Sequence, residues 1–247
     1  MIHLRRPRAE VALDTRTQSY LDRKSSDARK FTPRDVRVGK AWAAFLGTQA
    51  RDKVAEALDA YTKAKCAYCE QIAAKDIEHF WPKTLYPARM FDWENFLRGC
   101  KNCNNAKRDR FPTDGQGKNL LLDPCEDEPL DHFVWDGKTG AAGVVPDPSR
   151  AERGVTTIDL FQLNQEPIRE ERRLKYLVVL YLLARLIDEY PIEPETRERL
   201  REELLPQRPW LGIVRQLLLR PEDTVRPLVE RALAKLPEIR DWAADWI

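Results

Sequence analysis

Residues 66–110 read CAYCEQIAAKDIEHFWPKTLYPARMFDWENFLRGCKNCNNAKRDR, so two cysteine pairs enclose a Glu-His dipeptide. Two residues separate the cysteines of each pair, which lets both thiols reach one ion from a tight turn. Two such pairs complete the four-coordinate shell that structural zinc favours. We therefore expect a structural zinc ion held by four thiolates, those of Cys66, Cys69, Cys100 and Cys103. The alternatives are four unlinked buried cysteines or two disulfides.

The setting of the cysteines favours metal over disulfides. No secretory n-region and h-region opens the chain, so we expect a reducing, cytoplasmic environment in which disulfides are rare. Cys125 lies outside both pairs and is expected to be a small core or surface residue. The insert between the pairs is longer than in the commonest zinc-ribbon pattern, so an element of the fold should lie between them.

Side chains between and after the cysteine pairs resemble those of the HNH nuclease family. The signature of that family is the His of an acidic-His or His-His pair, an Asn in mid-motif, and a metal-binding His or Asn after the second cysteine pair. Glu78-His79 matches the first feature, Asn95 the second and Asn104 the third. The resemblance implies a ββα-metal core with treble-clef zinc. Asn104 stands where many members have His, and an amide oxygen suits a hard ion such as Mg²⁺.

Looser motifs over much of the chain resemble the HNH subunits of the Septu anti-phage systems, the PtuB group. They are Ile77-Glu78-His79-Phe80 with Pro82-Lys83, Cys103-Asn104 with Lys107, Leu121-Leu122-Asp123-Pro124, and Ile158-Asp159-Leu160 with Leu163-Asn164. This resemblance implies an effector that serves phage defence and is controlled by an ATPase partner.

Phosphodiester cleavage needs an activated water and relief of the charge that develops on phosphate. A neutral His can take a proton from water near neutral pH, so His79 is the expected general base. Glu78 and Asn104 are the expected ligands of a catalytic divalent ion, Mg²⁺ or another. Asn95 is expected to orient or polarise His79 through a side-chain or backbone hydrogen bond.

Strand geometry leaves the choice of acidic ligand open. Neighbours in a regular strand point to opposite faces, whereas Asp76 and Glu78 share one face. Glu78 and His79 can serve one site only if the dipeptide lies at a strand end or at a bulge. Otherwise Asp76, the reserve ligand, would hold the ion.

Basic residues follow the second cysteine pair. Asn104, Lys107 and Arg108 are spaced to share a helix face, and with Lys83 and Arg110 they are expected to bind nucleic-acid phosphates. The alternative is a solvated cationic face. Net charge is +2 over the chain, but residues 1–110 hold 23 Lys and Arg against 14 Asp and Glu, and the remainder holds 19 against 26. The basic half contains the motif, as expected for a protein that meets a polyanion.

Helix start and stop signals together with apolar periodicity predict an α+β, mainly helical fold. The resemblance adds an embedded HNH core. The predicted parts are an N-terminal arm and helix (1–65), the HNH core with its zinc knuckles (66–112), a loop-rich segment with short strands (113–165), and a C-terminal helical region (166–247). The expected helices are one within Arg34–Lys65 and others at Pro167–Tyr190, Glu195–Leu205, Pro209–Leu219, Pro221–Leu236 and Pro237–Ile247. The longest apolar run, Tyr176–Ile187, contains Arg185 and is too short to span a membrane.

The sequence therefore predicts a metal-dependent HNH endonuclease that acts on DNA. The alternatives are a zinc-stabilised nucleic-acid- or protein-binding module without catalysis, and an RNA-directed nuclease, because phosphate contacts do not separate the two nucleic acids. The acidic half from Glu166 to Ile247 is expected to dock a protein partner, with Trp242 and Trp246 as anchors. The competing interpretation is that its helices only complete a core.

Overall fold

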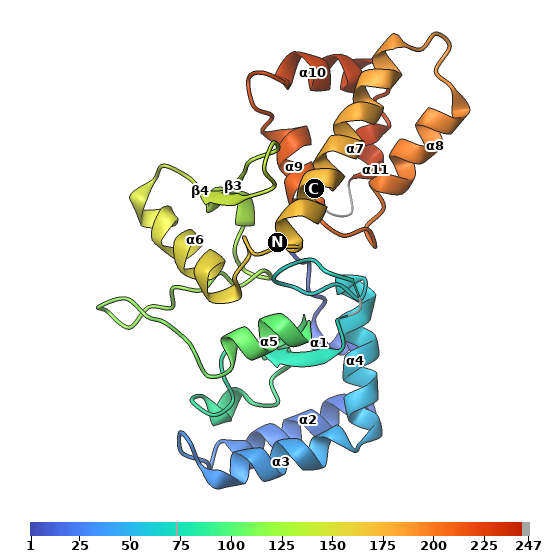
Figure 1. Ribbon diagram of the computed structural model, residues 1–247. Coiled ribbons are helices and arrows are strands. Elements are labelled where there is room, and N and C mark those ends of the chain that lie inside the picture. The colour runs from blue at the N-terminus through green and yellow to red at the C-terminus, as the bar shows by residue number, and fades with distance from the viewer. Residues whose placement is uncertain (73, 244–247) are drawn as a thin grey trace. The chain divides into compact units, whose positions relative to one another are not determined.

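The computed structural model describes residues 1–72 and 74–243 (Figure 1). The chain forms two compact units, which we call the N-terminal unit (Leu4–Glu126) and the C-terminal unit (Met1–His3 with Asp127–Ile247). Both are mainly helical, and each contains one two-stranded antiparallel sheet among the described residues. The segment expected to be loop-rich, 113–165, is divided between the two units.

The N-terminal unit places four helices before a hairpin and a short helix. Its elements are α1 (Ala9–Ala12), α2 (Thr15–Ala28), α3 (Val36–Leu46), α4 (Gln49–Thr62), β1 (Asp76–His79), η1 (Pro87–Arg89), η2 (Trp93–Asn95), β2 (Phe96–Gly99) and α5 (Lys101–Lys107). The order β1, β2, α5 is strand–strand–helix across the two cysteine pairs.

Helix starts in this unit follow from side-chain caps. Asp14 accepts a hydrogen bond from the Thr17 amide at the start of α2, and Thr48 accepts one from Arg51 at the start of α4. The expected N-terminal arm is thus largely helical, because the polar α2 still buries a narrow stripe that includes Leu21. The single helix expected within Arg34–Lys65 is two helices, since the Thr48 cap starts a new one.

An aromatic core joins α3 to the hairpin. The Phe45 side chain is fully buried, and its ring lies 5.7 Å from that of Phe91 and 6.4 Å from that of Phe96, centroid to centroid. Strands β1 and β2 pair so that Asp76 lies opposite Gly99 and His79 opposite Phe96. The core therefore packs directly beneath the residues that the sequence marks as functional.

An ion pair between buried Arg98 and half-buried Asp59 fixes the hairpin to α4. The Arg98 guanidinium donates to both carboxylate oxygens of Asp59, at 2.6 and 2.7 Å, and a third hydrogen bond of 3.0 Å reaches the Lys75 carbonyl. Bidentate pairs of this kind are strong and geometrically specific. Strand β2 is thereby held in one orientation against the helix.

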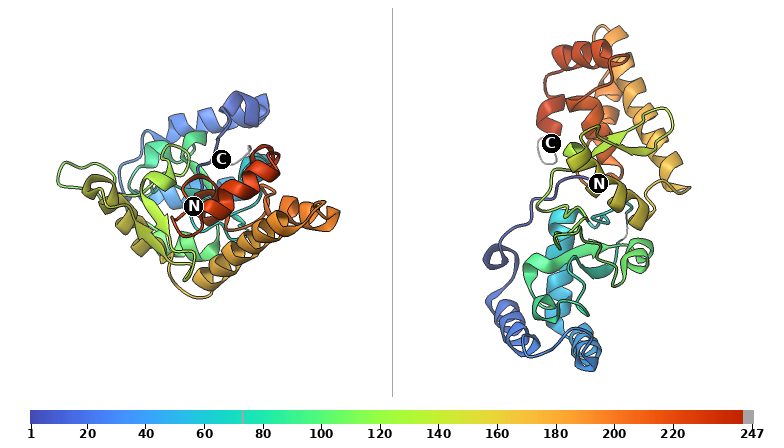
Figure 2. Two further views of the ribbon diagram at one scale, coloured as in Figure 1. Left: turned by 90° about the horizontal axis from the view of Figure 1, so that it is seen from above. Right: turned by 90° about the vertical axis from the view of Figure 1, so that its left-hand side faces the viewer.

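The C-terminal unit packs its helices around one long helix. Its elements are η3 (Pro129–Asp131), β3 (Phe133–Trp135), β4 (Ala142–Val144), α6 (Pro148–Phe161), α7 (Ile168–Asp188), α8 (Pro194–Glu203), α9 (Leu211–Leu219), α10 (Arg226–Lys235) and α11 (Ile239–Trp242). Helix α7 packs against α8, α9 and α10 (Figures 1 and 2). The helices predicted over 167–236 are present with boundaries shifted by a few residues.

One helix of the C-terminal unit differs from expectation. Helix α6 occupies part of the segment expected to be loops, because Asp147 caps it and a β-carbon at Gly154 would lie 2.8 Å from the His132 carbonyl oxygen. Gly154 thus permits a close contact between α6 and the backbone at His132, which the amino-acid composition of the segment does not reveal. Trp242 is half-buried beneath Arg197, whose guanidinium lies 5.5 Å from the ring centroid. Trp246, the other expected anchor, lies outside the described residues.

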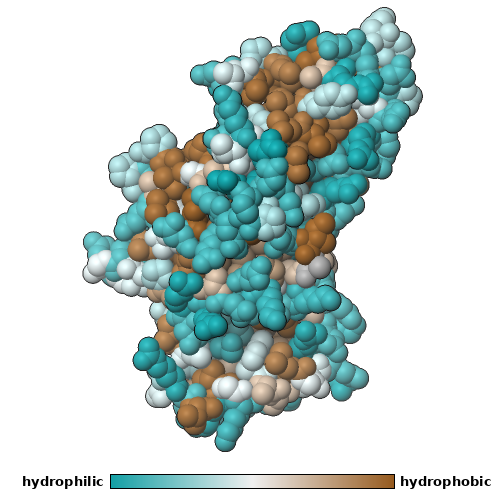
Figure 3. Space-filling model, in the orientation of Figure 1, coloured by the Kyte–Doolittle hydropathy of each residue, from teal (hydrophilic) through white to brown (hydrophobic). Residues whose placement is uncertain are grey.

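Surface character is mixed. On the face drawn in Figure 3, hydrophilic residues predominate, and apolar residues reach the surface at several places. Among the described residues, no helix is both long and apolar enough to cross a lipid bilayer.

The aromatic core gives a stability prediction. We expect Phe45→Ala to lower the free energy of unfolding of the N-terminal unit by about 3–5 kcal/mol, because it deletes a fully buried ring. Val36→Ala, at an exposed site on the same helix, should change it by less than about 0.5 kcal/mol. Urea unfolding followed by circular dichroism measures both, and equal effects would contradict the assignment of this core.

Candidate functional site

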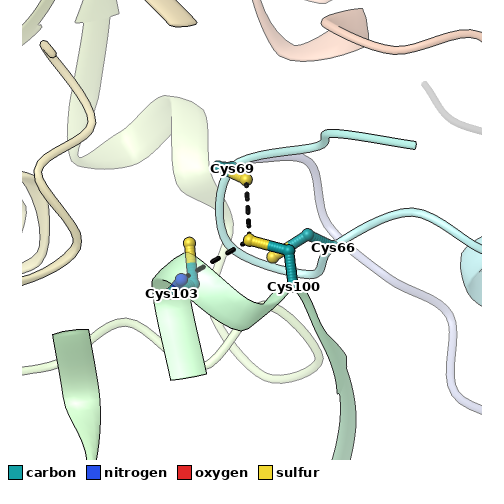
Figure 4. Close-up of side chains that lie close together, drawn as sticks. All are labelled: Cys66, Cys69, Cys100 and Cys103. Carbon is teal, nitrogen blue, oxygen red and sulfur yellow. Dashed lines mark hydrogen bonds between the residues drawn. The ribbon is translucent and has the colours of Figure 1, made fainter. Parts of the chain in front are cut away.

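The four paired cysteines converge in the N-terminal unit (Figure 4). Their sulfur atoms all lie within 4.8 Å of one another, and the Cys69 and Cys100 sulfurs are 3.7 Å apart. A tetrahedral zinc with bonds of about 2.3 Å separates its sulfurs by about 3.8 Å. The cluster can therefore hold a metal ion such as zinc. All five cysteines are free thiols, so the two-disulfide alternative is wrong.

Backbone contacts build the cluster onto the hairpin. Cys66 and Cys69 lie in the turn after α4, where the Ala67 amide donates to the Arg98 carbonyl at 2.8 Å. Cys100 follows β2 directly and caps α5, where its sulfur accepts from the Cys103 amide at 3.4 Å. A metal bound here would join the cysteine turn, the end of β2 and the start of α5.

Cys125 lies apart from the cluster, as expected. It is half-buried, and burial raises the pKa of its thiol to about 12. It is not among the four sulfurs that lie together.

A hollow of about 330 Å³ lies beside the cluster at the end of β1. It is lined by Glu78, His79, Pro82, Lys83, Asn104, Asn105, Arg108 and Asp109. Glu78 and His79 both reach it because His79 is the last residue of its strand, one of the two arrangements that strand alternation allowed. Asn104 reaches it from α5. Residues from the insert and from the segment that begins with α5 thus share one pocket.

His79 is held in one orientation by its surroundings. Its Nε2 lies 2.9 Å from the Met90 carbonyl oxygen, which can only accept, so Nε2 carries the proton. The ring packs edge-on against Trp42 and Phe96, with centroids 4.4 and 5.4 Å away. Burial, with a smaller contribution from nearby Lys83, moves the pKa of His79 well below its usual value. The neutral ring then keeps its lone pair on Nδ1, the form that can take up a proton.

Asn95 contacts the backbone near His79 and not the imidazole itself. It is fully buried, its Oδ1 accepts from the Trp81 amide at 2.7 Å, and its Nδ2 donates to the carbonyls of Trp81 and Arg89 at 3.0 and 2.9 Å. The expected hydrogen bond to His79 is not among these contacts. Since Met90 follows Arg89, Asn95 instead fixes the loop whose carbonyl orients the imidazole.

Lys107 does not lie on an exposed basic face, contrary to the expectation from its spacing. Its side chain is fully buried, with Nζ 2.8 Å from the Glu78 carboxylate and 2.6 Å from the His79 carbonyl oxygen. Helical spacing placed it correctly beside Asn104, but that face of α5 points at β1 rather than at solvent. Burial raises the pKa of Glu78, and the Lys107 ammonium opposes this rise.

The remaining predicted cations differ in position. Arg108 is exposed and lines the pocket. Lys83 also lines it but is half-buried, with its ammonium 5.5 Å from the Trp42 ring centroid. Burial lowers the pKa of Lys83. Arg110 is exposed, and its guanidinium donates to the Ala106 carbonyl rather than lining the pocket.

Asp76 and Asn104 are joined directly. The Asn104 amide nitrogen donates to a carboxylate oxygen of Asp76 at 2.8 Å. Asp76 does not line the pocket, whereas Glu78 does. Gly99 makes this packing possible, because a β-carbon there would come within 3.1 Å of the Glu78 β-carbon. Sequence reasoning missed Gly99, although a glycine beside a ligand cysteine is a readable sign of close packing.

Comparisons with known proteins point to one system. No family model matches the chain. Septu protein PtuB of Bacillus mycoides (strain KBAB4) is 28% identical over 138 residues, which covers 44% of this chain and 45% of that protein. Septu protein PtuB of Bacillus thuringiensis is 32% identical over 111 residues, 41% of this chain and 37% of that protein.

A third match has a different name. Septu protein PtuA of Bacillus mycoides (strain KBAB4) is 30% identical over 146 residues, 47% of this chain and 20% of that protein. The chain spans less than half the length of each of these relatives. The partial matches to PtuB support a Septu-related protein.

The cysteine cluster gives a metal prediction. We expect the purified protein to contain about one zinc ion per chain, and Cys66→Ser to lose it and unfold more easily, because metal-binding energy becomes folding energy. Cys125→Ser is the matched control and should keep both zinc and stability. Elemental analysis and thermal unfolding measure these results. Wild-type protein without stoichiometric zinc would contradict the assignment.

The buried ion pair between Lys107 and Glu78 gives a second prediction for this site. We expect Lys107→Met to cost about 3–5 kcal/mol of stability, because it leaves the Glu78 carboxylate buried without its cation. Adding Glu78→Gln should recover part of that loss, and Lys101→Met, at an exposed site on the same helix, should cost little. Chemical unfolding of the four proteins checks this. A stable Lys107→Met protein that only binds nucleic acid less well would show that Lys107 contacts phosphate instead.

Proposed function

We propose that the N-terminal unit is a metal-dependent nuclease of the HNH type that cleaves phosphodiester bonds in DNA. The observation that carries this proposal is the meeting of Glu78, His79 and Asn104 at one pocket beside the four-cysteine cluster. Glu78 and His79 are neighbours at the end of β1, whereas Asn104 comes from α5, so two separate elements bring these polar side chains to one pocket. A binding module without catalysis would not need a buried, neutral imidazole among the residues that line such a pocket.

His79 is the proposed general base. The hydrogen bond from Nε2–H to the Met90 carbonyl keeps the imidazole in the tautomer whose Nδ1 can accept a proton. Trp42 and Phe96 hold the ring on its edges. A base fixed in this way takes a proton from water without first having to reorient.

Oxygen atoms dominate the donor set for a catalytic ion. Glu78 and Asn104 are the proposed ligands, with Asp76 beside them, and such donors suit Mg²⁺. The hydrogen bond from the Asn104 amide nitrogen to Asp76 directs that amide and leaves its carbonyl oxygen for the ion. A bound divalent ion would stabilise the negative charge that develops on phosphate.

Cations at the pocket favour a polyanionic substrate. Lys83 and Arg108 line the pocket beside the proposed base and can hold the phosphates that flank the scissile bond. The proposed zinc has a separate and structural role, because four thiolates leave no open position on the ion. DNA is the proposed substrate. RNA is the alternative, and the cleavage assay below includes it.

The similarity to Septu proteins supports a role in anti-phage defence for the proposed nuclease. Matches to two PtuB proteins support an effector role, and the match to part of a PtuA protein supports a working association with that second component. We propose an ATPase partner of the PtuA type that controls cleavage. Co-purification of tagged chain with its co-expressed partner tests the association.

Loss of the base should abolish cleavage. We expect His79→Ala to lower the cleavage rate of plasmid DNA by about 10²–10⁴-fold, as is typical for a lost general base. Wild-type protein, alone and with its partner, is assayed with Mg²⁺ and Mn²⁺ on plasmid and on RNA of matched length. Zinc content and thermal unfolding of each variant show whether the fold survives.

Two further variants sharpen the assay. His79→Gln keeps a donor for the Met90 carbonyl and much of the ring volume but has no base, so it should be as inactive as His79→Ala. Cys125→Ser should keep wild-type activity. Cleavage within a few-fold of wild type by a folded His79→Gln protein would refute the assignment of the base. RNA cleaved in preference to DNA would overturn the choice of substrate.

A further inference from the structure

Helix α7 carries an apolar stripe on its exposed side. Leu174, Leu177, Val178 and Tyr181 are 48, 39, 40 and 60% exposed. Their spacing places them on one face of the helix. The opposite face of α7 packs into the unit, so the stripe is not part of that core. Contiguous apolar surface of this kind marks an interaction site.

A hollow adjoins the stripe. The stripe and Glu195, Thr196 and Arg199 of α8 line a depression of about 450 Å³. The depression can receive a side chain from a helix laid along α7. The surface is therefore shaped as well as apolar.

Opposite charges close the two ends of the stripe. Glu170 lies four residues before Leu174 on the same face, and Arg185 lies four residues after Tyr181. Their side chains are 48 and 49% exposed. Each makes a local ion pair at present, Glu170 with Arg173 at 2.7 Å and Arg185 with Glu189 at 2.6 Å. Glu170 and Arg185 are each about half exposed, and ion pairs of groups that water reaches contribute little, so both side chains can exchange or share partners.

Two copies of the stripe complement each other when the two helices run in opposite directions. From N- to C-terminus the face reads acid, three aliphatic side chains, an aromatic ring, and base. In an antiparallel pair, Glu170 of each copy meets Arg185 of the other, and Leu174 meets Tyr181. Leu177 and Val178 then lie near the two-fold axis. A parallel pair would instead set Glu170 against Glu170 and Arg185 against Arg185.

We propose that the protein forms a homodimer in which the α7 helices of two copies pack antiparallel along this stripe. A two-fold contact needs one patch that is complementary to itself, and this patch meets that condition in polarity and charge order. The proposal concerns the C-terminal unit and does not depend on the proposed nuclease activity.

The contact is modest in size. A standard stable interface uses about 20–30 residues per partner, and the stripe with its charged ends and the facing edge of α8 supplies fewer. We therefore expect a dimer that dissociates in the micromolar range. Dimerisation should then depend on protein concentration, as mass action requires.

Reversing one charge should break the dimer, and reversing both should restore it. Sedimentation velocity of the full chain, from about 1 to 200 µM, measures the dissociation constant. Glu170→Arg places two cations together at each end of the contact, and Arg185→Glu places two anions there. Each single variant should weaken the dimer by about tenfold or more, whereas the double variant should return to within about threefold of wild type.

Controls separate this contact from general effects of charge and folding. Glu230→Arg makes the same change at an exposed site on α10 and should leave the dissociation constant unchanged. Tyr181→Asp should abolish the dimer while thermal unfolding stays close to wild type, because the ring is mainly exposed. A chain that stays monomeric at the highest concentration overturns the proposal. A dimer that survives both single reversals, or a double variant that stays monomeric, overturns it equally.

Discussion

A buried ammonium group holds the proposed active site together. The Lys107 amine lies at the C-terminal end of α5 and contacts both the Glu78 carboxylate and the His79 carbonyl of β1. At the other end of the same short helix, Cys100 and Cys103 belong to the sulfur cluster. Helix α5 is thereby fastened to the hairpin at both ends, and the pocket forms beside it. Desolvating a lysine is costly, so the cation is tolerated only because a carboxylate and a carbonyl surround it.

Polar side chains do comparable work in the C-terminal unit. The Gln216 amide contacts both backbone groups of Trp135, at 2.6 and 2.7 Å, and joins α9 to β3 as a third strand would. Arg172 reaches from α7 to the carbonyls of Gly140 and Leu163 and lies 4.3 Å from the Trp135 ring centroid. Hairpins of three or four residues per strand are marginal alone. In both units, long polar side chains from helices complete the hydrogen bonding that such small sheets cannot provide.

Local spacing predicted the parts of the site that are local. Two residues between paired cysteines and the meeting of Glu78 with Asn104 follow from short-range geometry and one hairpin. The packing of Trp42 against His79 could not be predicted, because no residue near the motif indicates a contact with the earlier helix α3. The burial of Lys107 was missed for a related reason, since periodicity gives the face of a helix but not what covers that face.

Errors in the fold have similar causes. The polar α2 was expected to be an arm because its buried stripe is narrow, and α6 was hidden within a segment rich in Gly, Pro and Asp. In both, a capping Asp and tertiary packing outweighed composition. The C-terminal helices were easier, because their apolar faces repeat over several turns.

The Trp42 contact changes what counts as the smallest working piece of this protein. The HNH-like signature begins at Cys66, yet the imidazole it supplies packs edge-on against the Trp42 ring of α3, which lies outside that signature. A peptide cut to the signature would keep the four clustered cysteines and lose the ring that packs against the imidazole. Grafting these residues onto another scaffold therefore means carrying α3 along with them, and a search for relatives by signature alone overlooks the Trp42 contact.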